Sequence, residues 1–491
     1  MAQITRRVPT HLRLALLALF SPMAFGCTST EPTASPVDRI MERLAPAILI
    51  EGESSGSWTV TERMTFSSAP GVAVSFVDSP GPVWSRTVGV REAGTDTPLD
   101  PDTRFIAKSL AKSVTAFATL RLVDEGVLDL DAPLDEYLER WTIPDNEFTA
   151  RVRPTLRQLL AHRAGFTMWG VPSYRAGEPL PSLVQALNGE APAAAERVTI
   201  DYEPGSRSRY SGGGYTVLQL LLEDVTGESF PALMERLVLE PLQMDRSLFY
   251  PGVPAELESE TATGHDDKGN PIPGRWEALV QLAAGGLITT APDLSRFVAE
   301  VMSAFKGESV LLSQATALAM LTDHGEGRGL GFEVAGAGEA LRFSHTGSGD
   351  GFRALMLGLP ARSEGMVVLV NADGNRAGEL RNEIMRSVAL AYDWPGLQPE
   401  VRSVQEIDPA WYRTLLGVYE YSDGSLTTVS LSPAGLEAAW GDAAPSRLLT
   451  ADSLRYFTRS GESFRFAREG DIVVGLEWSG PGWSFEAQRQ R

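Results

Sequence analysis

The stretch from Arg104 to Leu120, RFIAKSLAKSVTAFATL, constrains the fold more than any other part of the chain. After Ser109, its apolar residues recur at a spacing that predicts a helix buried on most of its sides. These residues are Val114, Phe117, Ala118, Leu120, Leu122 and Val123. Gly126 is a suitable C-terminal cap for this helix. A helix of this kind has to lie inside a domain, with other elements packed around it.

Strand and helix signals on both sides of this helix predict one mixed domain over residues 46–395. Strands are expected over residues 71–77, 82–90, 329–336, 352–360 and 365–373. The first two are joined by turn residues and should form a hairpin. Further helices are expected over residues 213–227, 291–302 and 376–394. Residues 135–204 show a mixed pattern of helix and loop.

The pattern changes after a polar, proline-bearing linker at residues 396–407. Beyond it, short runs alternate apolar with polar residues, and turns such as Asp423-Gly424 separate them. Residues 408–491 are therefore expected to form a small all-β domain that resembles a barrel.

The N-terminus has the layout of a secretory signal peptide over residues 1–26. Arg6, Arg7 and Arg13 accompany an apolar run that is too short to span a bilayer. The run ends at Cys27, the only cysteine, in a sequence that resembles a bacterial lipobox. This resemblance implies cleavage before Cys27 and a lipid on its thiol, followed by a flexible tether at 27–45. We expect an exported protein anchored by lipid to a bacterial membrane, facing the periplasm or the cell exterior; secretion without a lipid is the alternative.

The charge balance argues against several classes of partner. The chain carries 43 basic and 63 acidic residues, for a net charge of −20. Such a chain repels nucleic acid and anionic lipid surfaces, so no nucleic-acid partner is predicted. No H-E-x-x-H motif or cysteine cluster is present, so neither a metal nor another cofactor is predicted. No feature of the sequence decides the oligomeric state.

Ser109 and Lys112 are candidates for a nucleophile and its base. Residues three apart share one face of a helix, so the lysine amine can approach the serine hydroxyl. A serine hydroxyl is a weak nucleophile until a base takes its proton, and Lys112 can do so only when uncharged, which requires a desolvated site. A second S-x-x-K pair, Ser303 and Lys306, falls at the end of an expected helix and is interpreted as surface.

Two later motifs strengthen the catalytic interpretation. Tyr210-Ser211-Gly212 precedes an expected helix, and His345-Thr346-Gly347 ends a strand-like run. In this order the three motifs resemble the serine β-lactamase and penicillin-binding-protein-like superfamily, and within it the branch of class C β-lactamases, esterases and D-aminopeptidases. The resemblance covers roughly residues 70–391 and includes LRQLLAHRAGFT at 156–167. It implies an α/β (α+β) fold: an antiparallel sheet flanked by helices, with a helical subdomain.

The resemblance also implies roles for individual residues. Ser109 would be the acylated nucleophile, Lys112 would take its proton, and Tyr210 would share the base role or pass the proton to the leaving group. The backbone N–H groups of Ser109 and Ser348 would form the oxyanion hole. Substrate would be bound by Gly212, His345, Thr346 and Gly347.

Two departures from the family pattern bear on the substrate. Gly212 stands where an asparagine is frequent, and His345, a weaker and pH-dependent cation, stands where true β-lactamases have lysine. Both predict at most weak β-lactam hydrolysis and favour esters, D-amino-acid peptides or cell-wall fragments. Two alternatives stay open: a non-hydrolytic binder of peptidoglycan fragments, and a lipoprotein scaffold whose β domain docks a partner.

Overall fold

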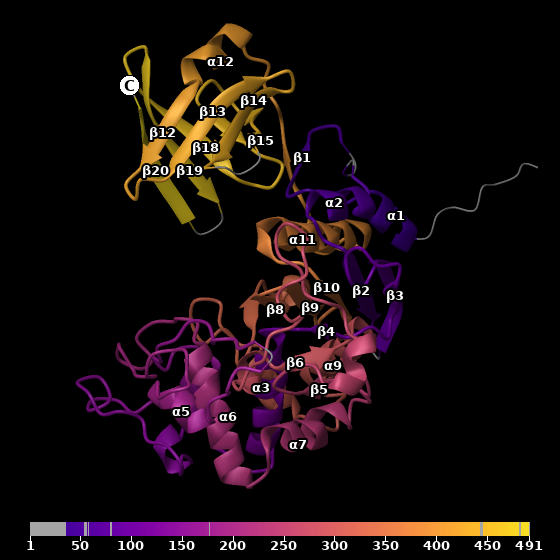
Figure 1. The fold of residues 1–491 in the computed structure, drawn as a ribbon, viewed down its shortest axis with the longest axis vertical. Coiled ribbons are helices and arrows are strands. Elements are labelled where there is room, and N and C mark those ends of the chain that lie inside the picture. Colours follow the sequence, from indigo (N-terminus) through magenta and orange to yellow (C-terminus); the bar gives the residue numbers. More distant parts are fainter. Residues whose placement is uncertain are drawn as a thin grey trace, which may run out of the picture.

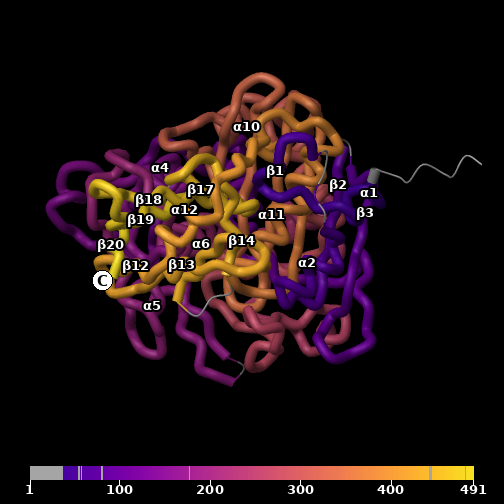
Figure 2. Tube along the Cα trace, turned by 90° about the horizontal axis from the view of Figure 1, so that it is seen from above, coloured from indigo at the N-terminus to yellow at the C-terminus, as the bar shows by residue number. Residues whose placement is uncertain are grey.

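The computed structural model describes residues 36–53, 56, 58–78, 81–175, 177–441, 445–480 and 483–490. The expected signal peptide, Cys27 and the first part of the tether lie outside these residues. Along the longest axis, a C-terminal barrel lies at one end and a helical subdomain at the other, with the main sheet between them (Figure 1). Seen from above, α1 and the strands β2 and β3 gather at one side (Figure 2).

The main sheet has six antiparallel strands in the order β3-β2-β10-β9-β8-β7. Their bounds are β2 Gly71–Asp78, β3 Gly81–Gly89, β7 Glu333–Ala335, β8 Arg342–Gly349, β9 Phe352–Leu359 and β10 Glu364–Val370. The hairpin predicted over residues 71–90 is present as β2 and β3. The strand predicted over 329–336 is shorter than expected, because only β7 pairs with β8.

Helices cover both faces of this sheet, as successive residues of β2 show. Val72, Val74 and Phe76 pack on one face with α1 (Pro36–Glu42), α2 (Val60–Phe66) and α11 (Gly374–Ala391). Ala73 and Val77 point to the opposite face and its core, which includes α9 (Ala291–Lys306) and α3 (Leu110–Asp124). The sheet is therefore the middle layer of a sandwich.

The expectation of a flexible tether up to residue 45 is wrong for its described part. Residues 36–42 form α1, and the side chains of Ile40 and Leu44 are buried beside α11. The Ala45 N–H donates to the Ser387 hydroxyl at 2.7 Å. The reason is that Val37, Ile40 and Leu44 make one apolar face, which a composition rich in Ser, Thr and Pro just upstream obscures.

The helix predicted after Ser109 is α3, and every residue from Leu110 to Leu120 is buried. It lies at the centre of the helical subdomain and is enclosed by the other helices of one large core. These elements are η1 Leu134–Glu136, α4 Leu156–Leu160, α5 Leu183–Asn188, α6 Gly212–Thr226, α7 Phe230–Met234, η2 Glu235–Leu239 and α8 Leu282–Gly285. The prediction of a centrally placed helix is confirmed.

Shorter elements complete the part of the chain that precedes the barrel. A three-stranded sheet in the order β4-β6-β5 joins Phe105–Ile106, Leu287–Thr289 and Leu248–Phe249. The remaining elements are η3 Ala255–Glu260, α10 Gln314–Met320 and η4 Gly338–Ala340. Because β4 pairs with β6, the chain just before Ser109 lies beside the segment that follows α8.

The C-terminal domain is a nearly closed sheet of nine strands, as the alternating pattern predicted. Its order is β15-β14-β13-β12-β20-β19-β18-β17-β16, so the two edge strands are neighbours in the chain. The strands are β12 Gly417–Tyr421, β13 Leu426–Ser432, β14 Gly435–Trp440, β15 Ser446–Arg447, β16 Leu449–Thr450, β17 Arg455–Phe457, β18 Ser463–Glu469, β19 Ile472–Gly480 and β20 Trp483–Arg489. One helix that the sequence did not predict, α12 (Pro409–Leu415), precedes them.

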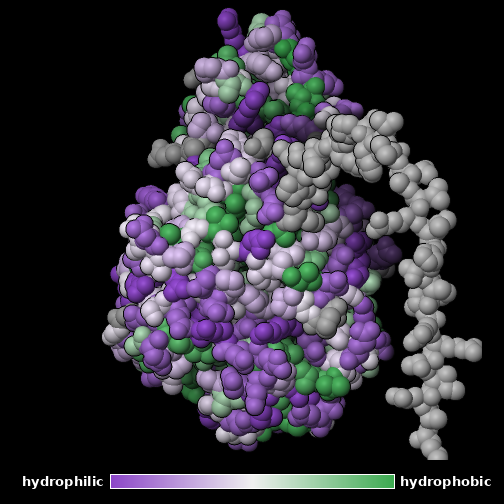
Figure 3. Space-filling view, turned by 90° about the vertical axis from the view of Figure 1, so that its right-hand side faces the viewer, coloured by the Kyte–Doolittle hydropathy of each residue, from purple (hydrophilic) through white to green (hydrophobic). Residues whose placement is uncertain are grey.

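The expected linker at 396–407 includes a strand. β11 (Glu400–Arg402) pairs in parallel with β1 (Ile48–Ile50), and Ile48 packs against Leu449 and Phe457 of the barrel domain. The barrel is thus fixed to the N-terminal part of the chain. Hydrophilic residues predominate on the face in Figure 3, with hydrophobic residues in small groups. Among the described residues, no helix is long and apolar enough to cross a membrane.

Candidate active site

Ser109 is the N-cap of α3, and its position follows from the turn before it. Ala107 N–H donates to the Leu287 carbonyl at 2.9 Å, which holds the chain against β6. Lys108 then takes a left-handed conformation with φ of 54°, and the helix begins at Leu110. The Ser109 hydroxyl makes no capping hydrogen bond, so its oxygen is available to other groups.

Lys112 lies one helical turn further on, and its amine faces the serine. The Nζ atom is 3.2 Å from Ser109 Oγ and donates to the Ala284 carbonyl of α8 at 2.6 Å. The side chain is buried. The shared helix face predicted from the S-x-x-K spacing is present, and a backbone carbonyl that the sequence did not point to holds the amine in place.

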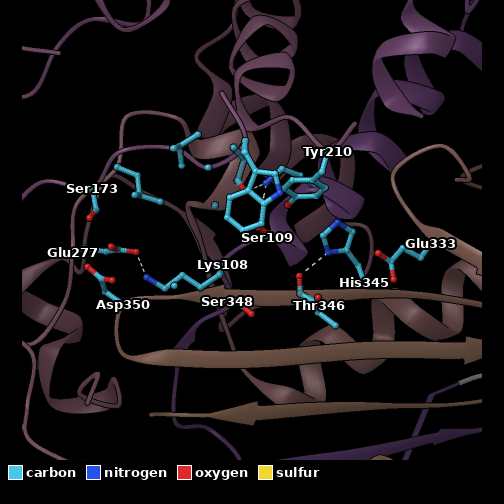
Figure 4. Close-up of a pocket in the computed structure, with 18 of the residues that line it drawn as sticks. Lys108, Ser109, Ser173, Tyr210, Glu277, Glu333, His345, Thr346, Ser348 and Asp350 are labelled. Atoms are coloured by element: carbon cyan, nitrogen blue, oxygen red, sulfur yellow. Dashed lines mark hydrogen bonds and ion pairs between the residues drawn. The ribbon is translucent and has the colours of Figure 1, made fainter. Parts of the chain in front are cut away.

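Tyr210 comes from a distant segment, the loop just before α6. Lys112 Nζ lies 4.9 Å from the centre of the Tyr210 ring. The same ring contacts the side chains of His162 and Trp169, with centroids 4.5 Å and 5.8 Å away. The three side chains singled out in the sequence, Ser109, Lys112 and Tyr210, therefore line one pocket. Figure 4 shows Ser109 and Tyr210 in this pocket.

The edge of β8 forms the floor of this pocket, and Gly347 allows it to approach Ser109. A Cβ at Gly347 would lie 2.3 Å from the carbonyl oxygen of Ala107, so any side chain here would push the strand away. On either side of this glycine, Thr346 and Ser348 are exposed and line the pocket. Ser348, the expected second donor of the oxyanion hole, thus belongs to the same pocket as Ser109.

His345 is buried and neutral, so the expectation that it is a pH-dependent cation is wrong. Its Nδ1 atom lies 2.8 Å from the Thr346 carbonyl oxygen. Burial lowers the pKa of His345 to about 3, and a positive charge on Lys112 or Arg328 lowers it further. A neutral imidazole cannot attract a substrate carboxylate as a lysine would.

Gly212 lies under the loop that carries Trp169. The Gly212 N–H donates to the Trp169 carbonyl at 3.0 Å. A Cβ at Gly212 would come within 2.9 Å of Val171 Cγ1 and 3.2 Å of the Gly170 backbone. This loop thus occupies the space that an asparagine side chain would need, which explains the departure at this position. The Trp169 side chain is 73% exposed and lines the pocket mouth.

Charged residues that the sequence did not point to lie at the two ends of the pocket. At one end Lys108 is buried in an ion pair with Glu277, close to the exposed Asp350. At the other end Arg328 pairs with Glu333 at 3.0 Å. Figure 4 shows both ends, with Ser109 and Tyr210 between them. Of these charged residues, only Lys108 is a neighbour of Ser109 in the sequence. The fold brings the others to the pocket.

The pocket has a volume of about 430 Å³, which suits a small molecule. One wall of the pocket is apolar and is formed by Trp169, Val171 and Leu279. Within the described ranges, no group of three or more His, Cys, Asp or Glu side chains is placed to hold a metal ion. The residues at hand are those of nucleophilic and acid–base chemistry.

A family model described as Beta-lactamase matches residues 59–390 of the chain. The chain belongs to the β-lactamase family. The match includes Ser109, Lys112, Tyr210 and the β8 motif, and it excludes the C-terminal barrel. The superfamily resemblance drawn from the three motifs is confirmed.

The names of curated relatives of this β-lactamase-family protein describe several activities. This protein is 27% identical over 296 residues to penicillin-binding protein 4 of Amycolatopsis lactamdurans, covering 58% of this chain and 70% of the relative. It is 29% identical over 220 residues to esterase EstB of Burkholderia gladioli, covering 43% of this chain and 55% of the relative. The chain thus spans only about half of the esterase's length. Hydrolases are therefore among its relatives.

Solved structures confirm the fold. A penicillin-binding protein homologue from Pyrococcus abyssi, described as octameric, superposes with a TM-score of 0.58 at 21% identity, covering 87% of this chain and 98% of that one. A D-amino acid amidase from Ochrobactrum anthropi SV3 gives a TM-score of 0.54 at 20% identity, covering 68% of this chain and 95% of that one. The β-lactamase-like fold predicted from the sequence is thus confirmed.

Proposed function

We propose that this protein is a serine hydrolase that acts through an acyl-serine intermediate on Ser109. The observation that carries the proposal is the contact of 3.2 Å between Lys112 Nζ and Ser109 Oγ at the N-terminus of a buried helix. The Tyr210 ring beside the same amine completes an arrangement that can take a proton from the serine. No metal or cofactor enters the proposed reaction.

The proposed reaction requires that the Lys112–Tyr210 pair lacks one proton. Either the lysine amine is neutral or the tyrosine hydroxyl is ionised. The Ser109 hydroxyl gives its proton to this pair as Oγ bonds to the substrate carbonyl carbon. The backbone N–H groups of Ser109 and Ser348 stabilise the negative oxygen that results. Donors of this kind contribute about 3–4 kcal/mol each in known hydrolases.

Collapse of this intermediate releases the leaving group. The bond from the carbonyl carbon to the leaving oxygen or nitrogen breaks, and Tyr210 supplies the proton that this atom takes up. A water molecule then gives a proton to the same pair and attacks the acyl carbon. Release of the acid returns the proton to Ser109, so the enzyme is unchanged after each cycle.

We propose esters with an apolar substituent as the preferred substrates. The neutral His345 offers no cation for the carboxylate of a β-lactam, and Gly212 offers no amide group. The apolar wall of Trp169, Val171 and Leu279 suits an uncharged group instead. β-Lactam hydrolysis is expected to be weak at most.

D-Amino-acid peptides or amides, including cell-wall fragments, are the second substrate class. The observation that favours them is the exposed Asp350 carboxylate at the pocket end opposite His345, which suits a substrate ammonium group. The relation to a D-amino acid amidase structure concerns the fold alone.

A serine-directed fluorophosphonate probe tests the proposal. We expect the intact mass of the wild type to rise by one adduct and that of Ser109→Ala to stay unchanged. A panel of p-nitrophenyl esters, nitrocefin and D-alanyl-D-alanine peptides then ranks the substrates. A folded wild type that neither reacts with the probe nor turns over any substrate would favour the non-hydrolytic binder or the scaffold.

We also propose that the protein is exported and held at a membrane by lipid on Cys27. The support is the sequence around residues 1–27, with its basic start, apolar run and lipobox-like end. Expression in a bacterial host tests this, because the wild type should sediment with membranes and Cys27→Ser should not. Equal distribution of both forms would contradict the lipid anchor.

A further inference from the structure

His162 binds the backbone on both sides of Tyr210. Its carbonyl oxygen accepts the N–H of Arg209 at 2.9 Å, and its ring atom Nδ1 accepts the N–H of Ser211 at 3.2 Å. Tyr210 is the single residue between these two hydrogen bonds. His162, which follows α4 in the chain, thus fixes the path of the main chain before and after Tyr210.

The ring of His162 also packs against the Tyr210 side chain. The two ring centroids are 4.5 Å apart, and the ring of Tyr215 lies 5.3 Å away on the same imidazole. Tyr215 is itself held, since its hydroxyl donates to the Leu160 carbonyl at 3.3 Å. Because the fixed Tyr215 ring supports the other side of the imidazole, the imidazole limits the rotation of the Tyr210 ring.

The hydrogen bond to Ser211 requires Nδ1 of His162 to be without a proton. Burial lowers the pKa of His162 well below its usual range. A positive charge on Lys112 or Arg328, which face this site from two other segments, lowers it further. The ring is therefore neutral at physiological pH and is a steady acceptor of the Ser211 N–H.

The backbone of His162 is left-handed, with φ of 57°. Few residues other than glycine adopt this conformation readily, but asparagine is among those that do. An asparagine side chain carries an oxygen that can accept a hydrogen bond near the place of Nδ1. The site therefore tolerates a substitution that keeps the acceptor and the backbone while it removes the imidazole.

We propose that His162 is a positioning residue that holds the phenol of Tyr210 next to Lys112. This inference rests on the proposed hydrolase function. His162 does not touch the reacting atoms; it acts through the hydrogen bonds on both sides of Tyr210 and through contact with its ring.

Three variants separate the acceptor from the ring. His162→Asn keeps an acceptor, His162→Gly keeps only the backbone conformation, and His162→Phe keeps a ring without an acceptor. With a p-nitrophenyl ester, we expect kcat to fall on the order of 100-fold in the glycine and phenylalanine variants, with KM changed little. The asparagine variant, which restores the acceptor but not the ring contact, should recover part of kcat. His324→Asn, a histidine outside the pocket, is the matched control and should behave as the wild type.

Thermal melting of each variant confirms that it is folded, and either the glycine or the phenylalanine variant suffices for the test. A folded glycine or phenylalanine variant that keeps kcat within about threefold of the wild type would overturn the positioning role. An asparagine variant as inactive as the glycine one would overturn the role of the acceptor. If the wild type itself shows no hydrolysis that depends on Ser109, the proposed function fails instead, so the two failures are distinguishable.

Discussion

Gly347 of β8 lies directly against the carbonyl group of Ala107, two residues before Ser109. A Cβ atom built on Gly347 would be 2.3 Å from the Ala107 oxygen, which is far closer than atoms can approach. The glycine is therefore what lets the strand edge and the helix N-terminus share one pocket.

Gly347→Ala should separate the two halves of the proposed oxyanion hole. Because the added methyl group meets backbone, β8 has to move away from Ser109, and we expect kcat/KM on a p-nitrophenyl ester to fall on the order of 100-fold. Overpacking should also cost about 1–3 kcal/mol of stability. Gly81→Ala, in the same sheet with open space around it, is the control. Unchanged kinetics in Gly347→Ala would contradict this account.

Trp169→Ala should change which esters are preferred. The exposed indole forms part of the apolar wall of the pocket, so its loss should reduce kcat/KM for p-nitrophenyl butyrate about 10-fold. The value for p-nitrophenyl acetate, whose acyl chain is two carbons shorter, should change less. Trp58→Ala removes another exposed tryptophan outside the pocket and should leave both values as they are. An equal loss on both esters would argue against a specificity role.

Acid should destabilise the protein through its buried histidines. The pKa of His345 is lowered from 6.5 to about 3, so between these values the unfolded chain binds a proton that the folded chain does not. The free energy of unfolding should therefore fall as pH falls from 6.5 towards 3, by up to about 1.4 kcal/mol per pH unit for this group. Denaturant titrations at several pH values measure this slope.

His345→Gln should reduce that slope, because glutamine does not titrate. His324→Gln, on a partly exposed loop histidine, should keep the slope of the wild type. If both variants lose stability in acid as steeply as the wild type, the destabilisation comes from other groups.

Removal of α1 should lower stability although it lies far from the pocket. A chain beginning at residue 46 lacks the buried side chains of Ile40 and Leu44, each worth about 1.5–3 kcal/mol of burial. We expect its melting temperature to be clearly below that of a chain beginning at residue 36, with similar kcat if it folds. Equal melting temperatures would show that residues 36–45 contribute no packing in solution.

Several features could be predicted because they depend on near neighbours in the chain. The buried helix after Ser109 follows from a repeating apolar pattern, and the approach of Lys112 follows from the helical repeat itself. The barrel strands likewise show their period of two residues. Local geometry settles such features before any tertiary contact forms.

Other features depend on segments that are distant in the chain, and the sequence pattern does not show them. Val171 fills the space beside Gly212, and the Ala284 carbonyl holds the Lys112 amine. The order of motifs indicated only that Tyr210 belongs with Ser109, not that His162 holds it.

By itself, the sequence determined the longer helices and strands, the order of the motifs and the family, because these follow from residue type and spacing along the chain. The tertiary structure alone decided that His345 is neutral and that residues 36–45 are packed. Both outcomes depend on which distant groups exclude water from a side chain, and desolvation is a property of the folded surroundings.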